Sequence, residues 1–134
     1  MKNYFIIVVS LIIEDNGNVL FMRRSHTCDH APGEWEFVSG RLEHGETLTE
    51  AALREAKEET GLTVEIIKMV DTFQYLRGSN QEPAVGMTYH CRKISGDVVI
   101  SDEHDEYRWI SIGEKLSINL PPAILKSYRQ FCGQ

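Results

Sequence analysis

The stretch Gly40–Leu62 constrains the fold more than any other part of the chain, because it specifies a helix whose two ends are both marked. Thr47 suits an N-cap, and Glu50 three residues later completes a capping-box pattern. Alanine and other good helix formers follow, until Gly61 offers the left-handed conformation that ends many helices. The sequence therefore predicts one helix over Thr47–Thr60.

Strand-forming segments lie on both sides of this helix. Apolar runs over Tyr4–Ile13 and Val19–Met22, joined by the turn sequence Asp15–Asn18, predict a hairpin. Further apolar stretches predict a short return at Trp35–Val38, one or two bulged strands over Thr63–Tyr75, strands over Ala84–Ile94 and around Tyr107–Ile110, and a final helix opened by Pro121-Pro122. Polar stretches predict loops over Arg23–Glu34, Gly40–Gly45 and Gly78–Pro83. This pattern indicates an α/β fold in which helices flank a mixed β-sheet.

Composition narrows the class of protein. The 134 residues, 42% hydrophobic and 25% charged, suit a single domain over 1–134. A net charge of −6 argues against a nucleic-acid polymer as partner, although metal ions would let the chain hold a small polyphosphate. Three widely spaced cysteines indicate reduced thiols, and the N-terminal apolar run is too short for a membrane span and lacks a cleavage site. We therefore expect a cytoplasmic monomer or homodimer without membrane contact.

Three glutamates of the predicted helix are candidate ligands for a divalent cation. Glu55, Glu58 and Glu59 are related as i, i+3 and i+4, so they share one helical face and repel each other unless a cation is present. Carboxylate oxygens are the ligands that Mg²⁺ and Mn²⁺ prefer. Arg54 should point about 100° away from Glu55 and is free to brace Glu46 or a neighbouring carboxylate instead of pairing with that face. The simpler alternative is a solvated acidic surface, which is common.

The wider spacing favours the metal site. Seven residues stand at the fixed positions of the Nudix box, and Leu62 supplies its final aliphatic position: Gly40, Glu46, Arg54, Glu55, Glu58, Glu59 and Gly61. Over these 23 residues the chain resembles the Nudix hydrolase family. Ala56 departs from the pattern, because the family usually has a larger aliphatic residue there, which puts local packing in question but not the chemistry.

The resemblance implies an α/β/α sandwich with a mixed β-sheet and a loop–helix–loop that holds Mg²⁺, with Mn²⁺ as an alternative. Glu58 and Glu59 would be metal ligands, and Glu55 a ligand or the general base. Gly40, Glu46 and Arg54 would support them. The carbonyl oxygen of Ser39 would be a further ligand.

Residues outside the box are less constrained by the sequence. The acidic run before Trp109 offers one more metal ligand, with Glu106 as first choice and Glu103 as second, against the alternative of a solvated turn. Arg23 or Arg24 would grip a substrate phosphate, or simply lie at the surface. For four aromatic residues, core packing is favoured over base stacking: Trp35, Phe37, Phe73 and Tyr75. The five histidines show no metal-ligand spacing and are interpreted as ordinary polar residues.

The resemblance implies hydrolysis of a phosphoanhydride in a nucleoside diphosphate derivative. Arg77 stands where subgroups that prefer ADP-ribose carry proline, and no tyrosine follows where subgroups that prefer dinucleoside polyphosphates carry one. The upstream pattern of coenzyme A pyrophosphatases is also missing. Elimination favours a small nucleoside triphosphate as substrate. Two alternatives remain: a catalytically silent Nudix-fold module that binds nucleotides or proteins, and an isopentenyl diphosphate isomerase, which would need further metal-binding and catalytic residues.

Overall fold

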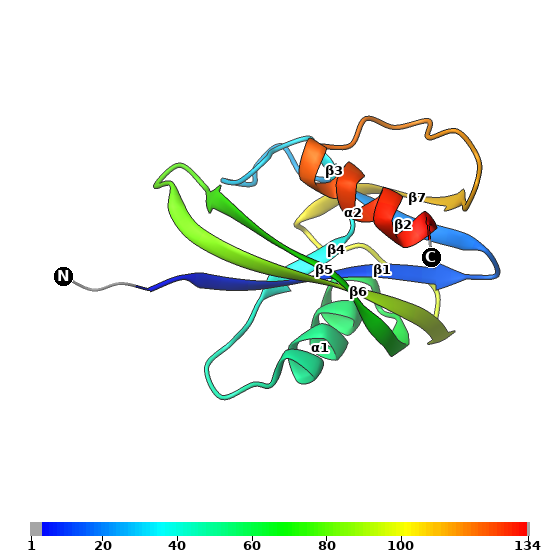
Figure 1. Cartoon of the computed structure of the whole chain (residues 1–134), viewed down its shortest axis with the longest axis horizontal. Coiled ribbons are helices and arrows are strands. Elements are labelled where there is room, and N and C mark those ends of the chain that lie inside the picture. The colour runs from blue at the N-terminus through cyan, green and yellow to red at the C-terminus, as the bar shows by residue number, and fades with distance from the viewer. Residues whose placement is uncertain (1–3, 134) are drawn as a thin grey trace.

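A mixed β-sheet with one helix on each face makes up the protein (Figure 1). The computed structural model describes residues 4–133, so the ends of the predicted 1–134 domain lie outside the described residues. The elements in chain order are β1 (Ile6–Asp15), β2 (Asn18–Arg24), β3 (Trp35–Glu36), β4 (Val38–Arg41), α1 (Leu48–Thr60), β5 (Thr63–Arg77), β6 (Glu82–Ser95), β7 (His104–Ser111) and α2 (Pro122–Cys132).

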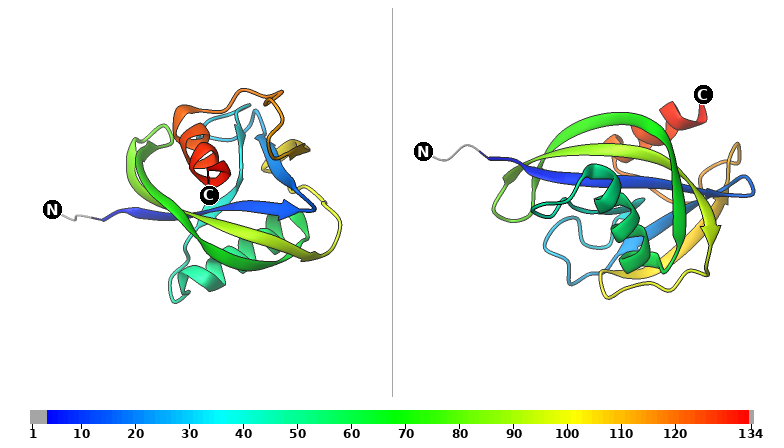
Figure 2. Two further views of the ribbon diagram at one scale, coloured as in Figure 1. Left: turned by 45° about the vertical axis from the view of Figure 1, so that its right-hand side comes forward. Right: turned by 90° about the horizontal axis from the view of Figure 1, so that it is seen from below.

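The strand order explains why the sheet is mixed. Strands β3, β2, β1, β6 and β5 follow one another across the sheet, while β4 pairs with β1 and β7 pairs with β2. The β1–β6 pair is parallel, and the other pairs are antiparallel. Helices α1 and α2 lie on opposite faces of this sheet (Figure 2). The predicted α/β/α sandwich with a mixed sheet is therefore confirmed.

Each helix covers its own hydrophobic core. Alternate residues of β1 point to opposite faces, so Leu11 and Ile13 join the core beneath α1 while Ile12 joins the core beneath α2. Ala56 is fully buried, and its small side chain lets α1 pack closely on the sheet. The α2 core holds Tyr128 and other residues at helical spacing, as the final helix was expected to provide.

The strands are longer than the local sequence signals indicate. The hairpin turn is confirmed, with positive φ at Asn16 and Gly17. The loop predicted over Gly40–Gly45 begins too early, because Gly40 and Arg41 pair with β1 as part of β4. Likewise β2 extends through Arg24, and β6 begins at Glu82 rather than at Ala84. Neighbouring strands supply these hydrogen bonds, and such long-range partners leave no mark in the local sequence.

Two findings in the structure bear on the expectations from composition. No helix within residues 4–133 is long and apolar enough to span a bilayer. The three cysteines are free thiols: Cys28, Cys91 and Cys132. Cys91 is fully buried, and this burial raises the pKa of its thiol to about 12, so it packs as a small hydrophobic residue.

Candidate active site

Helix α1 holds the glutamate-rich face in place through both of its ends. The hydroxyl of Thr47 accepts a hydrogen bond from the Glu50 N–H at 3.1 Å, and the Glu50 carboxylate accepts one from the Thr47 N–H at 2.9 Å. Gly61 adopts φ 75° and donates its N–H to the Lys57 carbonyl. The predicted capping box and glycine stop are thus confirmed, and they fix which residues face the sheet.

Glu55 packs directly against the backbone of Gly40. A Cβ built on Gly40 would lie 1.9 Å from Glu55 Cδ, so only glycine leaves room for this carboxylate. Glu55 is 7% exposed, and burial, opposed by Arg54, raises the pKa of its carboxyl to about 7. A carboxylate with such a pKa is suited to accept a proton near neutral pH.

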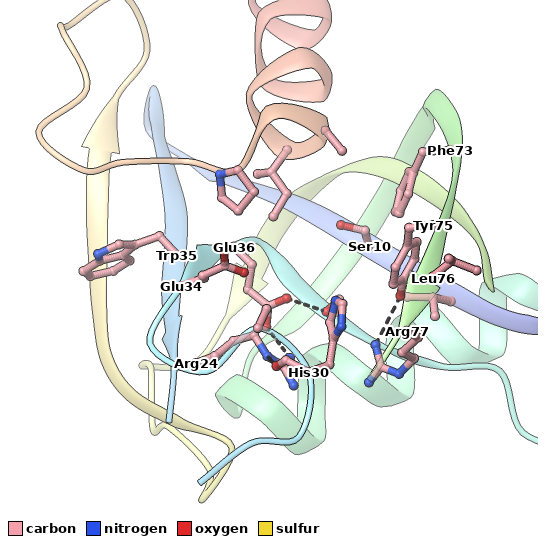
Figure 3. A pocket seen from close by; sticks show the side chains of 16 residues that line it. Ser10, Arg24, His30, Glu34, Trp35, Glu36, Phe73, Tyr75, Leu76 and Arg77 are labelled. Atoms are coloured by element: carbon pink, nitrogen blue, oxygen red, sulfur yellow. Dashed lines mark hydrogen bonds and ion pairs between the residues drawn. The ribbon is translucent and has the colours of Figure 1, made fainter. Parts of the chain in front are cut away.

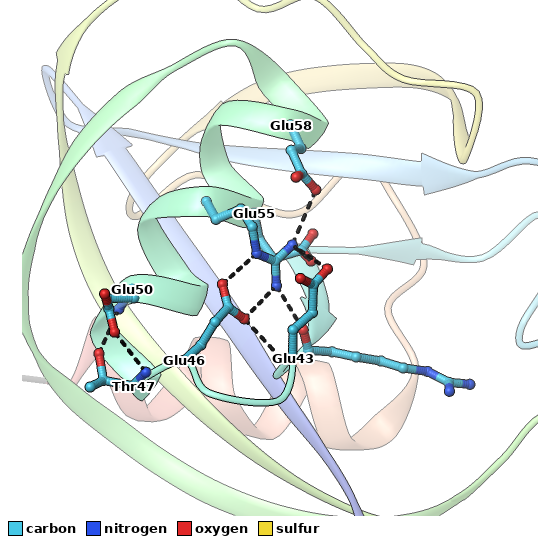
Figure 4. A network of polar contacts seen from close by, with 8 residues as sticks. Glu43, Glu46, Thr47, Glu50, Glu55 and Glu58 are labelled. Carbon is cyan, nitrogen blue, oxygen red and sulfur yellow. Dashed lines mark hydrogen bonds and ion pairs between the residues drawn. The ribbon is translucent and has the colours of Figure 1, made fainter.

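Arg54 joins three of the box glutamates (Figure 4). Its guanidinium forms a bidentate pair with Glu46, at 2.6 and 2.9 Å, and also lies 2.7 Å from Glu55 Oε1 and 3.1 Å from Glu58 Oε2. The expected contact with Glu46 is present, and hydrogen bonding to Arg54 lowers the pKa of that carboxyl to about 2. The expectation that Arg54 avoids the glutamate face is wrong, because its long side chain curves back and its fork of donors serves several carboxylates at once.

Glu59 is held from the sheet side. Its Oε2 accepts a hydrogen bond from the Ser101 hydroxyl at 2.6 Å and lies 3.4 Å from His104 Nδ1. Burial alone would raise the pKa of the Glu59 carboxyl, but these contacts outweigh burial and lower it. Glu58, by contrast, is exposed to solvent. The face therefore presents one open carboxylate between two buried ones.

Glu36 and His104 were missed as functional residues by the sequence analysis. His104 Nε2 lies 2.9 Å from Glu36 Oε2, to which Arg24 also donates at 3.0 Å, and the Ser39 hydroxyl donates to the other oxygen at 3.0 Å. Burial alone would lower the pKa of His104, but its contacts with Glu36 and Glu59 raise it to about 9. A glutamate inside an apolar strand was the available signal, since a buried carboxylate needs partners. His104 carried no such signal.

The acids proposed from outside the box contact groups other than the box glutamates. Glu106 pairs with Arg23 at 3.2 Å and with Arg108 at 2.9 Å. Both arginines lie over the Trp35 ring, at 5.9 and 5.0 Å from its centre. Glu103 is exposed and contributes its backbone carbonyl, which accepts from the Ser25 N–H. The residues of this region that reach the box glutamates are Ser101 and His104.

A cavity of about 250 Å³ is lined by residues of β3, β5 and the start of α2, among others (Figure 3). Phe37 is fully buried in the core, and Trp35 packs against the same core, as expected. Trp35, Phe73 and Tyr75 also line the cavity. Its charged lining residues are Arg24, Glu34, Glu36 and Arg77. Ser39 of β4 also lines the cavity, and the next residue, Gly40, packs against the Glu55 carboxyl group.

The donor set suits a hard divalent cation. Glu55, Glu58 and Glu59 offer carboxylate oxygens from one helical face, which is the ligand chemistry of Mg²⁺ and Mn²⁺. Glu59 Oε1 is not engaged by Ser101 or His104. Between residues 4 and 133, no three His, Cys, Asp or Glu side chains converge on a ready-made cage. Glu55 and Glu58 instead turn toward the Arg54 guanidinium.

Comparison with known proteins gives one consistent result. A family model described as the NUDIX domain matches residues 4–131. The chain is 25% identical to a nucleoside triphosphatase NudI of Enterobacter sp. (strain 638), covering 92% of this chain and 94% of that protein. It is 32% identical to a CTP pyrophosphohydrolase of Escherichia coli (strain K12), covering 87% and 83%.

Solved structures agree with these relatives. The crystal structure of a MutT protein from Methanosarcina mazei Go1 has a TM-score of 0.82 at 25% identity, over 99% of this chain and 96% of that one. The solution structure of the E. coli ORF135 protein has a TM-score of 0.78 at 29% identity, over 96% and 89%. Both likenesses extend over nearly the whole chain.

Proposed function

The chain belongs to the Nudix hydrolase family, and on this premise we propose that it hydrolyses nucleoside triphosphates to nucleoside monophosphates and pyrophosphate in a reaction that requires Mg²⁺ or Mn²⁺. One observation carries the proposal: Ser39 lines the aromatic-lined cavity, and its neighbour in β4, Gly40, packs against Glu55 of the glutamate face. The relatives named for hydrolysis of a nucleoside triphosphate and of CTP support the choice of substrate.

The cavity accounts for recognition of the nucleoside. Phe73 and Tyr75 stack on each other with ring centres 5.7 Å apart, and both line the cavity. Such rings offer a flat apolar surface for a base. Arg77, which donates to the Tyr75 hydroxyl at 3.1 Å, supplies a positive charge beside them. Arg24 also lines the cavity, but its charge is matched by Glu36, so Arg77 is the better candidate for a phosphate contact.

The glutamate face accounts for the chemistry. Glu58 and Glu59 would hold the cation, with the carbonyl oxygen of Ser39 as a further oxygen donor and Glu55 as either another ligand or the general base. Such a cation, when bound, would neutralise phosphate charge and lower the pKa of water at the site. As general base, the buried Glu55 carboxylate would accept a proton from the attacking water. Arg54, itself held by Glu46, fixes the position of the Glu55 carboxylate.

A substrate panel tests the proposal. The wild-type protein is incubated with the common ribo- and deoxyribonucleoside triphosphates, a nucleotide sugar and a dinucleoside polyphosphate, with and without Mg²⁺, and the products are separated by anion exchange. We expect nucleoside monophosphate and pyrophosphate from triphosphates, only when metal is present. Glu58→Gln should lose at least a hundredfold in turnover, while Glu65→Gln, an exposed glutamate of β5, should not.

Two results would contradict the proposal. Saturable nucleotide binding with no hydrolysis of any compound in the presence of Mg²⁺ would favour the silent binding module. Equal turnover by the wild type and Glu58→Gln would show that the glutamate face of α1 is not part of the active site.

A further inference from the structure

A buried row of alternating charges runs from the cavity to helix α1. Arg24 of β2 contacts Glu36 of β3, Glu36 contacts His104 of β7, and His104 contacts Glu59 of α1. The four residues are 6%, 8%, 4% and 7% exposed, respectively. Residues of three strands and one helix thus form one chain of polar contacts within an otherwise apolar region.

The contacts at Glu59 are unequal between its two oxygens. Oε2 accepts from the Ser101 hydroxyl at 2.6 Å and faces His104 Nδ1 at 3.4 Å, whereas Oε1 is left out of both contacts. His104 Nδ1 is buried and has no well-aligned hydrogen-bond acceptor, so Glu59 is its charge partner. The other ring nitrogen is fixed by Glu36, which sets the plane of the imidazole.

Burying such a row of charges costs free energy, so stabilising the fold is a poor explanation for its presence. Desolvation of buried charges consumes most of their mutual attraction, and apolar residues of similar volume often serve folding as well. Groups that contact a metal ligand from behind orient that ligand and strengthen its hold on the metal. The geometry at Glu59 matches this second purpose, because the contacts restrain one oxygen and leave the other free.

We propose that His104 is a positioning residue for Glu59: together with Ser101 it restrains Oε2, so that Oε1 is available to the divalent cation. Through Glu36 and Arg24 the same residue ties this glutamate to the wall of the nucleotide cavity. The inference rests on the proposed function, because it assigns Glu59 to the metal.

Direct metal binding tests the inference without any substrate. Free Mn²⁺ is measured by electron paramagnetic resonance in titrations of the wild type, His104→Gln and Ser101→Ala. Loss of a residue that orients a metal ligand typically weakens metal binding roughly 10- to 100-fold, which we expect for His104→Gln. Ser101→Ala removes one hydrogen bond near the surface and should weaken binding roughly 2- to 10-fold. This second variant keeps the test valid if His104→Gln folds poorly.

His90→Gln is the matched control. His90 also pairs with a glutamate, Glu14, at 2.9 Å, but it packs against Phe131 under helix α2. Its substitution should leave Mn²⁺ affinity unchanged. In turnover assays on folded protein, His104→Gln should need more Mg²⁺ for half-maximal rate, and excess Mg²⁺ should restore much of kcat.

The outcomes separate the inference from the function on which it rests. Wild-type Mn²⁺ affinity in folded His104→Gln and in Ser101→Ala would overturn the role of His104 and leave the hydrolase proposal standing. A wild-type protein that binds no Mn²⁺ would overturn both.

Discussion

Gly40 has no room for a side chain, because a Cβ there would overlap the Glu55 carboxyl group at 1.9 Å. Gly40→Ala should therefore displace Glu55 and lower turnover at least tenfold. The overpacking should cost about 1–3 kcal/mol of stability, which leaves the protein folded. Turnover and chemical denaturation of the same preparation measure the two effects.

Gly133→Ala provides the comparison for that variant. Gly133 has an ordinary φ of −80°, and the nearest atom to an added Cβ is 3.4 Å away. This substitution should change neither stability nor turnover appreciably. If Gly40→Ala behaved in the same way, the close packing of Glu55 on the backbone would have no catalytic importance.

Glu46 makes a pH-dependent contribution to stability. Hydrogen bonding to Arg54 lowers its pKa from 4.5 to about 2, so the folded state favours the charged carboxylate. A lowered pKa adds stability above the unfolded-state value, and this stability is lost as pH falls from 4.5 toward 2. The difference in free energy of unfolding between wild type and Glu46→Gln should be constant above about pH 6 and shrink below about pH 4.5. Denaturation at a series of pH values measures it, and a difference that stays constant down to pH 3 would contradict the assignment.

The capping box determines how firmly helix α1 begins. Thr47 and Glu50 exchange two hydrogen bonds there. Thr47→Ala should cost about 1 kcal/mol of stability, because one helix N–H loses its acceptor. Thr47→Ser keeps the hydroxyl and should recover most of that loss in thermal or chemical denaturation. Equal stability of the two variants would show that the cap contributes nothing.

At this scale, local signals explain which elements the sequence predicts well. Helix α1 was placed to within a residue because its cap, its alanines and Gly61 are adjacent in the chain. The ends of β2, β4 and β6 are not predicted as closely, because they depend on pairing with distant strands. The same limit applies to the site: residues in the box follow from its spacing, whereas His104 reaches Glu59 only because β7 pairs with β2.

The whole molecule carries a net charge of −6, to which the helix face contributes several acids close together. A cation bound there would relieve repulsion in the folded chain, and the unfolded chain has no comparable site. A ligand that binds only the native state stabilises it by roughly 1–3 kcal/mol when its concentration exceeds Kd ten- to a hundredfold. For a chain of this size the corresponding rise in Tm is roughly 3–10 °C.

Millimolar Mg²⁺ should therefore raise the Tm of the wild type and raise it much less in the double variant Glu58→Gln/Glu59→Gln. Because Glu59→Gln also removes the charge partner of buried His104, the Tm of each protein without metal serves as its own baseline. Scanning calorimetry with and without chelator measures both shifts. NaCl at the same ionic strength separates specific binding from screening, since screening acts on all surface charges. Equal shifts with NaCl and Mg²⁺, or equal shifts in the two proteins, would place the cation elsewhere on the molecule.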